Sequence, residues 1–523
     1  MTDFAAGSKN TLSRRSFALA LAAPLALRAQ PAALQARIKL DSDRRIGAID
    51  PLLYGNFAEH LGRCIEGGIF EEGSPLSDAK GYRKDVRQAI QDLHVTQMRW
   101  PGGNFSSNYH WMDGIGPRAQ RPPRLEMAWG TVESNRFGTH EFLDYSEELG
   151  FEPYICANFG TGSWDEAQQW VEYCNSSEDT AMTRLRRKNG REKPWKVKYW
   201  GLGNEMDGPW QMGHRTAEDY GKFALEGAKL MKWTDPGVRL IAAGSSNFRS
   251  DVDWTGWNRE VLAYLKDHIE YLSLHTYVGN PANDYEDFLA VANQLDDRIR
   301  TAGGIIRSAL GGERPGHPIY IAFDEWNVWY RARGDSQRGR RILEEHYNLE
   351  DALVVATFLN TFVNNAALVK MANMAQIVNV IAPIFTNEKG LFLQTIYFPL
   401  QLFAKNCRGA ALETFVESPK YESRSFGSAD YLHVSSSLDG RTLTINAVNR
   451  HHNRDIEAEI EVQDAAFGGK VEIALVTADD IKARNDFGKQ TVGIATDTAA
   501  ASGSRYRHRF PPHSFTQLRV PLA

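Results

Sequence analysis

Eight short apolar runs that alternate with helical patterns are the feature that most constrains the fold of this chain. The runs cover residues 53–59, 95–104, 151–158, 197–204, 239–244, 271–277, 318–325 and 375–383. Such runs are typical of parallel strands that are buried on both faces. Strands that alternate with helices predict crossover connections, and eight such units close most simply as a (β/α)8 TIM barrel.

The segments between these runs have the periodicity of amphipathic helices. Val86, Ile90 and Leu93 fall on one face of a helix that precedes the second run. Residues 163–166, Ser-Trp-Asp-Glu, have the capping-box pattern that begins a helix after the third run. We therefore predict an α/β fold with its barrel over residues 46–407.

Beyond the barrel the pattern changes to a period of two. Ile456, Ala458, Ile460 and Val462 alternate with charged residues, and shorter alternating segments precede and follow them. This pattern predicts antiparallel strands. We expect a C-terminal β-sandwich, jelly-roll-like, over residues 408–523, joined by a strand from about residues 37–45.

Residues 1–36 have the pattern of an export signal. Ser-Arg-Arg-Ser-Phe at residues 13–17 precedes an apolar stretch that runs to residue 27. This order is typical of a twin-arginine signal peptide and predicts a periplasmic or extracellular protein, with a disordered basic tail as the alternative. The apolar stretch is too short to span a bilayer stably, and no later segment reaches ~18 uninterrupted apolar residues. We expect no membrane association after signal removal.

Charge and cysteine content restrict the partners. The formal net charge of -5 does not favour a polyanion, so nucleic acid is not an expected partner. The four cysteines show no CxxC spacing, which argues against a zinc site or a disulfide framework. We therefore expect a small or neutral substrate.

Two motifs place a glutamate at the end of a strand-like run: Gly-Leu-Gly-Asn-Glu at residues 201–205 and Phe-Asp-Glu-Trp-Asn at residues 323–327. Because the carboxyl ends of barrel strands meet on one face, Glu205 and Glu325 are expected to share a pocket. Retaining glycoside hydrolysis needs one carboxylic acid to protonate the leaving oxygen and a second carboxylate to attack the anomeric carbon. Asn204 would supply an amide for a sugar hydroxyl. Ordinary ion-paired acids are the alternative for either glutamate alone.

Four longer motifs resemble glycoside hydrolase family 51, whose common members are α-L-arabinofuranosidases. They are Tyr-Gly-Asn-Phe-Ala-Glu-His-Leu-Gly-Arg-Cys at 54–64, Arg-Trp-Pro-Gly-Gly-Asn-Phe at 99–105, Tyr-Trp-Gly-Leu-Gly-Asn-Glu-Met-Asp-Gly-Pro-Trp at 199–210, and Asp-Glu-Trp-Asn-Val-Trp-Tyr at 324–330. The resemblance runs from about residue 46 to the chain end. It departs from the family at Glu66, where an aromatic residue at the pocket rim is more usual.

The resemblance implies a barrel with a β-sandwich, retention of configuration, Glu205 as acid/base, Glu325 as nucleophile, and no metal or organic cofactor. The positions that match substrate-binding residues of the family are Glu59, Asn104, Asn204, His275, Tyr277 and Gln376. Trp329 is expected to line the pocket wall. Without the motifs, His275 would be read as a core histidine, since a metal role lacks a second ligand at helical spacing. Glu59 has an alternative as a structural partner of Arg63.

The leading hypothesis is an exo-acting enzyme that releases terminal non-reducing α-L-arabinofuranosyl residues from arabinan, arabinoxylan or derived oligosaccharides. An endo-glucanase or β-xylosidase of the same barrel clan would keep both glutamates but have an open cleft. A carbohydrate-binding protein without turnover is the alternative from another class. The resemblance also implies a homo-oligomer, commonly a hexamer, which no sequence pattern tests.

Overall fold

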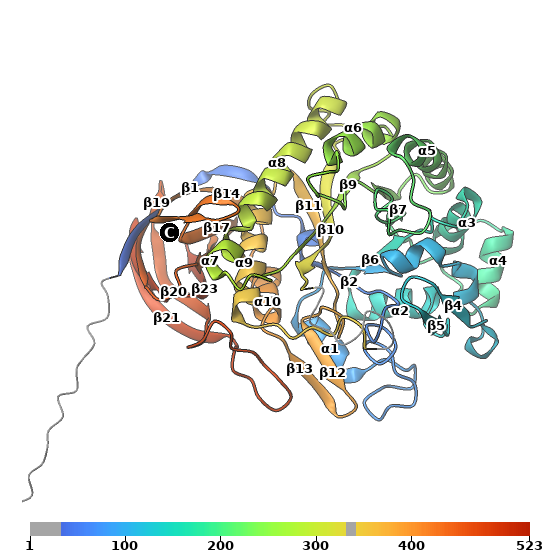
Figure 1. The fold of residues 1–523 in the computed structure, drawn as a ribbon, viewed down its shortest axis with the longest axis horizontal. Coiled ribbons are helices and arrows are strands. Elements are labelled where there is room, and N and C mark those ends of the chain that lie inside the picture. Colours follow the sequence, from blue (N-terminus) through green and yellow to red (C-terminus); the bar gives the residue numbers. More distant parts are fainter. Residues whose placement is uncertain (1–32, 331–340) are drawn as a thin grey trace, which may run out of the picture. The chain divides into compact units, whose positions relative to one another are not determined.

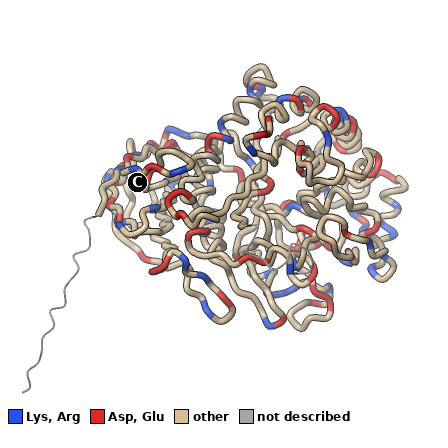
Figure 2. Tube along the Cα trace, in the orientation of Figure 1, with Lys and Arg blue, Asp and Glu red and all other residues tan. Residues whose placement is uncertain are grey.

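The structure is a computed structural model that describes residues 33–330 and 341–523, and Ala33–Ala523 forms one compact unit (Figure 1). Residues 1–32, which hold nearly all of the predicted export signal, lie outside the described residues. Acidic and basic residues are interspersed along the trace (Figure 2). In the part of the chain that is described, no helix is both long enough and apolar enough to cross a membrane.

Eight parallel strands of the described chain close into a barrel, as the alternating apolar runs predicted. Around the barrel the strands are β2 (Gly55–Phe57), β3 (Gln97–Trp100), β6 (Glu152–Cys156), β7 (Tyr199–Leu202), β8 (Arg239–Ala242), β9 (Tyr271–Val278), β10 (Tyr320–Val328) and β11 (Val369–Ala375). Tyr154, Tyr199, Ile241 and Tyr271 come from four successive strands and form one buried apolar cluster. Residues from several strands thus fill the barrel.

Helices connect the strands. They are α1 (Lys84–Asp92), α2 (Thr139–Leu149), α3 (Trp164–Asn175), α4 (Ala181–Lys188), α5 (Ala217–Thr234), α6 (Trp254–Leu265), α7 (Tyr285–Ala290), α8 (Ala292–Ala309), α9 (Leu349–Asn364) and α10 (Tyr397–Asn406). The predicted start of α3 is confirmed, because the Ser163 side chain accepts a hydrogen bond from the Glu166 amide at 3.1 Å. Gly150 caps the end of helix α2, and its φ of 76° is the left-handed conformation that glycine adopts readily.

The eighth barrel strand is not where the sequence pattern placed it. We predicted residues 375–383, whereas β11 ends at Ala375 and the following residues form a buried connection. The run that contains Ile377, Val378 and Val380 is rich in β-branched residues, which favoured it in the prediction. The true strand instead carries Lys370 and Asn373, and its position is fixed by pairing with β10 and β2. Gln376 therefore follows the strand and does not begin it.

The C-terminal region forms a mostly antiparallel sheet, as predicted. In the described residues it has nine strands, in the order β21 (Ala495–Gly503), β20 (Phe467–Val476), β23 (Ser514–Pro521), β18 (Thr442–Asn449), β17 (Leu432–Asp439), β14 (Ala410–Glu417), β1 (Leu34–Ala48), β19 (Ile456–Gln463) and β22 (Arg505–Phe510). The two outer strands, β21 and β22, are joined through Ser504 alone. The sheet must therefore curl until its two ends meet, and it encloses a separate apolar cluster.

Strand β1 brings the start of the described chain into the middle of this sheet. It pairs antiparallel with β14 and parallel with β19. It is longer than the predicted strand of about residues 37–45. Residues 34–36, which the predicted signal boundary included, pair with Ile456, Glu457 and Ala458.

Side chains on α9 connect the barrel to the sheet. The Asn360 amide donates to the His433 carbonyl at 3.1 Å and its oxygen accepts from the Ser435 hydroxyl at 2.6 Å. Asn364 donates to the Val434 carbonyl at 3.0 Å. These bonds satisfy carbonyl groups of β17 in the contact between helix and sheet.

Short hairpins and 3-10 helices complete the described structure. The hairpin strands are β4 (Arg124–Glu126) with β5 (Thr131–Glu133), β12 (Ile384–Asn387) with β13 (Gly390–Leu393), and β15 (Lys420–Ser423) with β16 (Gly427–Asp430). The 3-10 helices are η1 (Pro51–Tyr54), η2 (Asn104–Asn108), η3 (Trp111–Gly114) and η4 (Arg118–Gln120). The β4–β5 hairpin belongs to the long connection between β3 and α2, which extends over the carboxyl end of the barrel to reach the site described next.

Candidate active site

Glu205 and Glu325 face one another at the carboxyl ends of the barrel strands. Glu205 follows β7 in a turn with a φ of 46°, and Glu325 lies on β10. Carboxylate oxygens of the two side chains lie within 4.8 Å of one another. This upper limit for the two nearest oxygens favours the ~5–5.5 Å separation of a retaining pair over the ~6.5–9.5 Å of an inverting pair, which leaves room for a water.

A buried arginine orients the Glu325 side of this pair. Arg99, on β3, donates from Nη1 to Glu325 Oε1 at 2.7 Å and from Nη2 to Asn204 Oδ1 at 2.6 Å. Its guanidinium also lies 4.6 Å from the centre of the Phe57 ring. Tyr277 donates its hydroxyl to the other oxygen, Glu325 Oε2, at 2.8 Å. Both oxygens of Glu325 therefore accept hydrogen bonds, which hold its carboxylate in one orientation.

His275 lies between three carboxylates. Its Nδ1 is 3.0 Å from Glu205 Oε1 and 3.5 Å from Glu325 Oε2, and its Nε2 is 3.3 Å from Asp324 Oδ1. Burial lowers the pKa of His275, but the Glu325 charge and the hydrogen bonds to Asp324 and Glu205 outweigh it and raise this pKa well above its usual value. The ring is thus held as an imidazolium.

Glu205, His275 and Glu325 are also close enough together to hold a metal ion. An imidazolium has no lone pair for a metal, however, and both nitrogens of His275 already face carboxylate oxygens. The donor set therefore fits a hydrogen-bonded network between carboxylates better than a metal centre.

The environment of Glu205 favours its protonated form. Burial raises the pKa of Glu205, the His275 hydrogen bond opposes this rise, and the charge of nearby Glu325 adds to it. Trp210, in the turn after β7, donates its indole N–H to Glu205 Oε2 at 2.5 Å. A carboxyl group with a raised pKa beside an ionised one is the arrangement that separates a proton donor from a nucleophile.

Glu59 and Gln376 close the opposite side of the site. Gln376 donates to Glu59 Oε2 at 3.0 Å, and the Phe105 amide and the Trp129 indole donate to Glu59 Oε1 at 3.0 and 3.1 Å. Burial raises the pKa of Glu59 to about 8. Arg63 pairs with Glu344 at 2.6 Å and, among the described residues, forms no ion pair with Glu59. The alternative reading of Glu59 as the partner of Arg63 is therefore wrong.

These groups line a cavity of about 590 Å³. The predicted residues at its surface are Glu59, Asn104, Glu205, His275, Tyr277, Glu325, Trp329 and Gln376. Asn204 is buried and is not itself among the lining residues; its oxygen accepts from Arg99, and its amide nitrogen lies close to Gly103, which lines the cavity. Glu66 is not part of the cavity surface and instead bonds to the Ser134 hydroxyl.

Several residues of the site were not predicted. Arg99, Trp129, Trp210 and Arg298 all contact or line the cavity region. A signal for Arg99 was present, because an arginine inside an apolar strand must find buried acceptors. The glycines that follow it were a second signal. A Cβ on Gly103 would lie 2.7 Å from Glu325 Oε1, and one on Gly102 would lie 2.5 Å from Glu59 Cγ.

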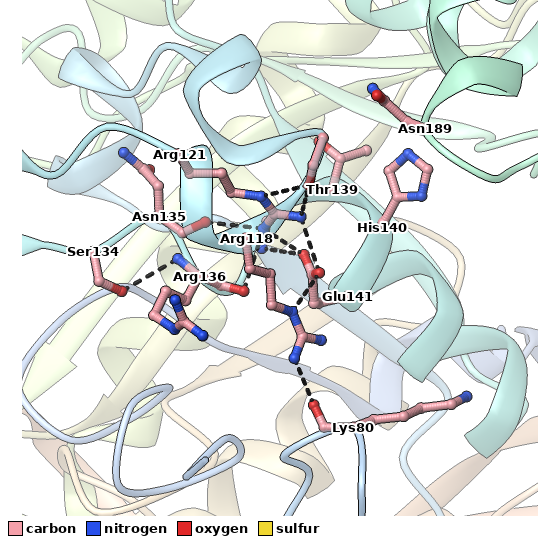
Figure 3. A network of polar contacts seen from close by, with 12 residues as sticks. Lys80, Arg118, Arg121, Ser134, Asn135, Arg136, Thr139, His140, Glu141 and Asn189 are labelled. Atoms are coloured by element: carbon pink, nitrogen blue, oxygen red, sulfur yellow. Dashed lines mark hydrogen bonds and ion pairs between the residues drawn. The ribbon is translucent and has the colours of Figure 1, made fainter.

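The long connection that carries Trp129 is anchored outside the cavity by a polar network (Figure 3). Glu141, in the first turn of α2, accepts from Arg121 at 2.8 and 3.0 Å and from Arg118 at 3.0 Å. Arg121 also donates to the Asn135 carbonyl at 2.9 Å. The network therefore ties both arms of the β4–β5 hairpin to the start of α2.

A closed (β/α)8 barrel with two facing carboxylates at the carboxyl ends of its strands is the arrangement expected of a glycoside hydrolase. Residues 89–298 match the family described as Alpha-L-arabinofuranosidase 1 domain, and residues 324–514 match Alpha-L-arabinofuranosidase C-terminal domain.

Whole-chain relatives agree with these matches. The chain is 41% identical over 508 residues to the probable alpha-L-arabinofuranosidase C of Aspergillus clavatus, which covers 92% of this chain and 96% of the relative. It is 39% identical over 496 residues to the intracellular exo-alpha-(1->5)-L-arabinofuranosidase 1 of Bacillus subtilis. This match covers 93% of this chain and 99% of the relative. Among solved structures, this chain is similar to the thermostable GH51 alpha-L-arabinofuranosidase from Thermotoga petrophila, with a TM-score of 0.85 and 39% identity. The match covers 93% of this chain and 100% of the Thermotoga petrophila chain. The chain belongs to glycoside hydrolase family 51, the family of these α-L-arabinofuranosidases.

The comparisons correct the predicted location. The Bacillus subtilis relative and a second bacterial relative, from Halalkalibacterium halodurans at 39% identity, are both named intracellular enzymes. The prediction of an exported, periplasmic or extracellular protein is therefore wrong. A pair of arginines before a short apolar stretch is a weak pattern, because it depends on composition over few residues and on no packing constraint.

Proposed function

We propose that this chain is a retaining, exo-acting α-L-arabinofuranosidase that removes terminal non-reducing α-L-arabinofuranosyl residues from arabinan, arabinoxylan or their oligosaccharides. The observation that carries the proposal is the pair of carboxylates, Glu205 and Glu325, with oxygens within 4.8 Å of one another in one cavity. The names of the relatives support the choice of sugar.

The proposed reaction has two displacements. In the first, Glu325 attacks the anomeric carbon while Glu205 gives its proton to the glycosidic oxygen, so that the leaving alcohol departs neutral and a glycosyl ester forms on Glu325. In the second, Glu205 removes a proton from water, and the resulting hydroxide attacks the anomeric carbon and releases Glu325. Two inversions at this carbon retain its configuration.

Surrounding groups adjust the two glutamates for these roles. Arg99 and Tyr277 hold Glu325 through both oxygens, which fixes the direction of attack. Glu205 loses its negative neighbour when Glu325 becomes an ester, because the charge that helped to raise the pKa of Glu205 is then gone. The same group can therefore act as an acid in the first step and as a base in the second.

The remaining lining residues are proposed to bind the sugar. Glu59, Asn104 and Gln376 present polar atoms at one side of the cavity, where the furanose hydroxyls would lie. Asn204 is proposed to donate its amide to the 2-hydroxyl. His275 and Tyr277 are proposed to hold the two glutamates. Trp329 forms the wall beside Tyr277, with 5.3 Å between the two ring centres. Assembly into a homo-oligomer, as the family resemblance implies, is part of this proposal.

The proposal is tested by hydrolysis of p-nitrophenyl α-L-arabinofuranoside with the full chain and its Glu325→Gln variant. We expect turnover by the wild type and a loss of about 10³-fold or more in the variant, because the nucleophile is removed. Turnover of other aryl glycosides but not of this one would reject the sugar assignment.

The role of Glu205 is tested by Glu205→Ala. We expect the variant to lose about 10²–10⁴-fold activity on an arabinofuranosyl oligosaccharide and much less on the p-nitrophenyl substrate, because p-nitrophenolate leaves without a proton. Equal losses on the two substrates would contradict the assignment of Glu205 as proton donor.

A further inference from the structure

Arg298 is a cation in the cavity wall that has no acidic partner among the described residues. It lies on α8, and its Nη1 donates to Thr276 Oγ1 at 3.0 Å. Its guanidinium lies 4.1 Å from the centre of the Phe248 ring. Burial lowers the pKa of Arg298 to about 10, and in the described chain no carboxylate offsets this.

Several other buried arginines are neutralised by carboxylates, although buried Arg186 donates to backbone carbonyls instead and buried Arg450 has no ion pair in the described chain. Arg83, Arg99 and Arg121 contact the carboxylates of Asp85, Glu325 and Glu141 at 2.6, 2.7 and 2.8 Å. A partly buried cation without such a partner costs free energy, unless a ligand supplies the negative charge. Because Arg298 lines the cavity, a bound ligand can reach it.

The position of Arg298 corresponds to the leaving group of the proposed reaction, so this inference rests on the proposed function. Around the barrel, β8 lies opposite β2. Glu59 follows β2, whereas the segment 246–249 follows β8 and Arg298 is bonded to Thr276 on β9. If the furanose lies against Glu59, the leaving group must extend past Glu205 toward β8 and β9.

The wall around Arg298 is held in place. Asp207 accepts hydrogen bonds from the backbone amides of Ser246 and Asn247 at 2.8 and 3.1 Å, which fixes the segment that carries Phe248. With the Phe248 ring 4.1 Å away and Thr276 bonded to one nitrogen, the Arg298 guanidinium keeps further N–H groups for a ligand. A planar guanidinium matches the two oxygens of a carboxylate.

We propose that Arg298 forms a carboxylate subsite on the leaving-group side, so that the enzyme prefers arabinofuranosides whose leaving group carries a carboxylate near the scissile bond. This carboxylate could belong to a uronosyl residue of an oligosaccharide or to an aromatic acid. Both sources share the chemistry that Arg298 recognises.

The first test compares carboxyphenyl and carbamoylphenyl α-L-arabinofuranosides, each in meta and para forms. The two substituents have the same shape and differ in charge. We expect the ratio of their kcat/KM values, at the better position, to fall about tenfold in Arg298→Gln relative to wild type, as for loss of one charge-assisted hydrogen bond. Arg259→Gln, exposed on α6 away from the cavity, is the matched control and should keep the wild-type ratio.

Two further measurements cover a variant that folds poorly. Arg298→Lys keeps the charge and should retain part of the preference. In the wild type alone, raising the salt concentration should reduce the carboxylate preference, because the contact is between charges. An unchanged ratio in Arg298→Gln, with turnover of both substrates, would overturn the subsite and leave the proposed function standing. Absence of turnover of all aryl arabinofuranosides would reject the proposed function itself.

The source of the carboxylate is distinguished with oligosaccharides. Arabinofuranosyl oligosaccharides that carry a uronosyl residue beside the scissile bond are compared with neutral counterparts, in wild type and Arg298→Gln. A preference that Arg298→Gln removes identifies a uronosyl ligand. If the Arg298-dependent preference appears only with the aryl carboxylates, the subsite takes an aromatic acid.

Discussion

At the scale of single residues, the ionisation of Glu59 connects the sugar-binding side of the cavity to folding. Burial raises the pKa of Glu59 to about 8, the Phe105 amide opposes this rise, and the Glu325 charge adds to it. An unfolded glutamate titrates near 4.5. Between these two values the folded chain holds a proton that the unfolded chain has released, so stability falls as pH rises through this window.

We predict that Glu59→Gln flattens this pH dependence. The free energy of unfolding of the wild type should fall more between pH 5.5 and 8.5 than that of the variant, by at least about 1.4 kcal/mol, which corresponds to one unit of pKa difference. Denaturant unfolding at both pH values measures it. Glu218→Gln, exposed on α5, should keep the wild-type pH dependence. Parallel pH dependences for the wild type and Glu59→Gln would show that Glu59 is ionised throughout.

The sequence indicated the glutamates of the site more readily than the groups that hold them. Glu205 and Glu325 end apolar runs, so strand geometry alone placed them on one face of the barrel, and the structure brings them together. Arg99 lies in a similar run, but its contacts with Glu325 and Asn204 join residues far apart in sequence. Such contacts depend on the closed barrel and leave no local periodicity.

At the scale of elements, periodicity located seven of the eight barrel strands to within a few residues. It failed for β11, because Lys370 and Asn373 break the apolar run while the following buried connection contains more β-branched residues. Asn373 is tolerated since its amide donates to the Asn56 carbonyl and to Gln97 Oε1, both at 3.1 Å. A polar residue that is satisfied only by neighbouring strands cannot be assigned from its own segment.

We predict that Glu141→Gln loosens the connection that carries Trp129. Glu141 holds Arg118 and Arg121 and also accepts from the Gly138 amide at 2.9 Å. Loss of its charge leaves buried Arg121 without an ionic partner, which should cost about 3 kcal/mol of stability. Because Trp129 bonds to Glu59, KM should also rise several-fold while kcat changes less.

The matched control is Glu147→Gln on the same helix. Its carboxylate is about half exposed, with 49% of the side chain accessible, and pairs with Arg191. We expect a change of about 0–1 kcal/mol there, as for a surface ion pair. Denaturant unfolding and steady-state kinetics measure both variants. If Glu141→Gln changes stability but leaves KM as in the control, the network does not position Trp129.

At the scale of the whole molecule, the first described strand completes a sheet built from the last hundred or so residues. The alternation of Arg37, Ile38, Lys39 and Leu40 predicted a strand associated with this sheet. Its place in the interior of the sheet, between β14 and β19, was not predictable, because both partners are more than 350 residues away in sequence. The chain between these strands forms a long loop that must close for them to pair, and the composition of either strand does not indicate which distant segment will be its partner.

The interior position of β1 leads to the last prediction. Ile38 is fully buried in the apolar cluster of the sheet and pairs with Val416 and Ile460, whereas its neighbour Lys39 is exposed on the other face. Ile38→Ala should therefore cost about 2–5 kcal/mol, and Lys39→Ala should change stability by less than about 0.5 kcal/mol. Thermal unfolding of both variants measures the difference. Since the cavity residues come from the barrel and its connections, kcat/KM of folded Ile38→Ala should stay within about twofold of wild type. A large loss of kcat/KM without loss of stability would instead mean that the sheet shapes the cavity directly.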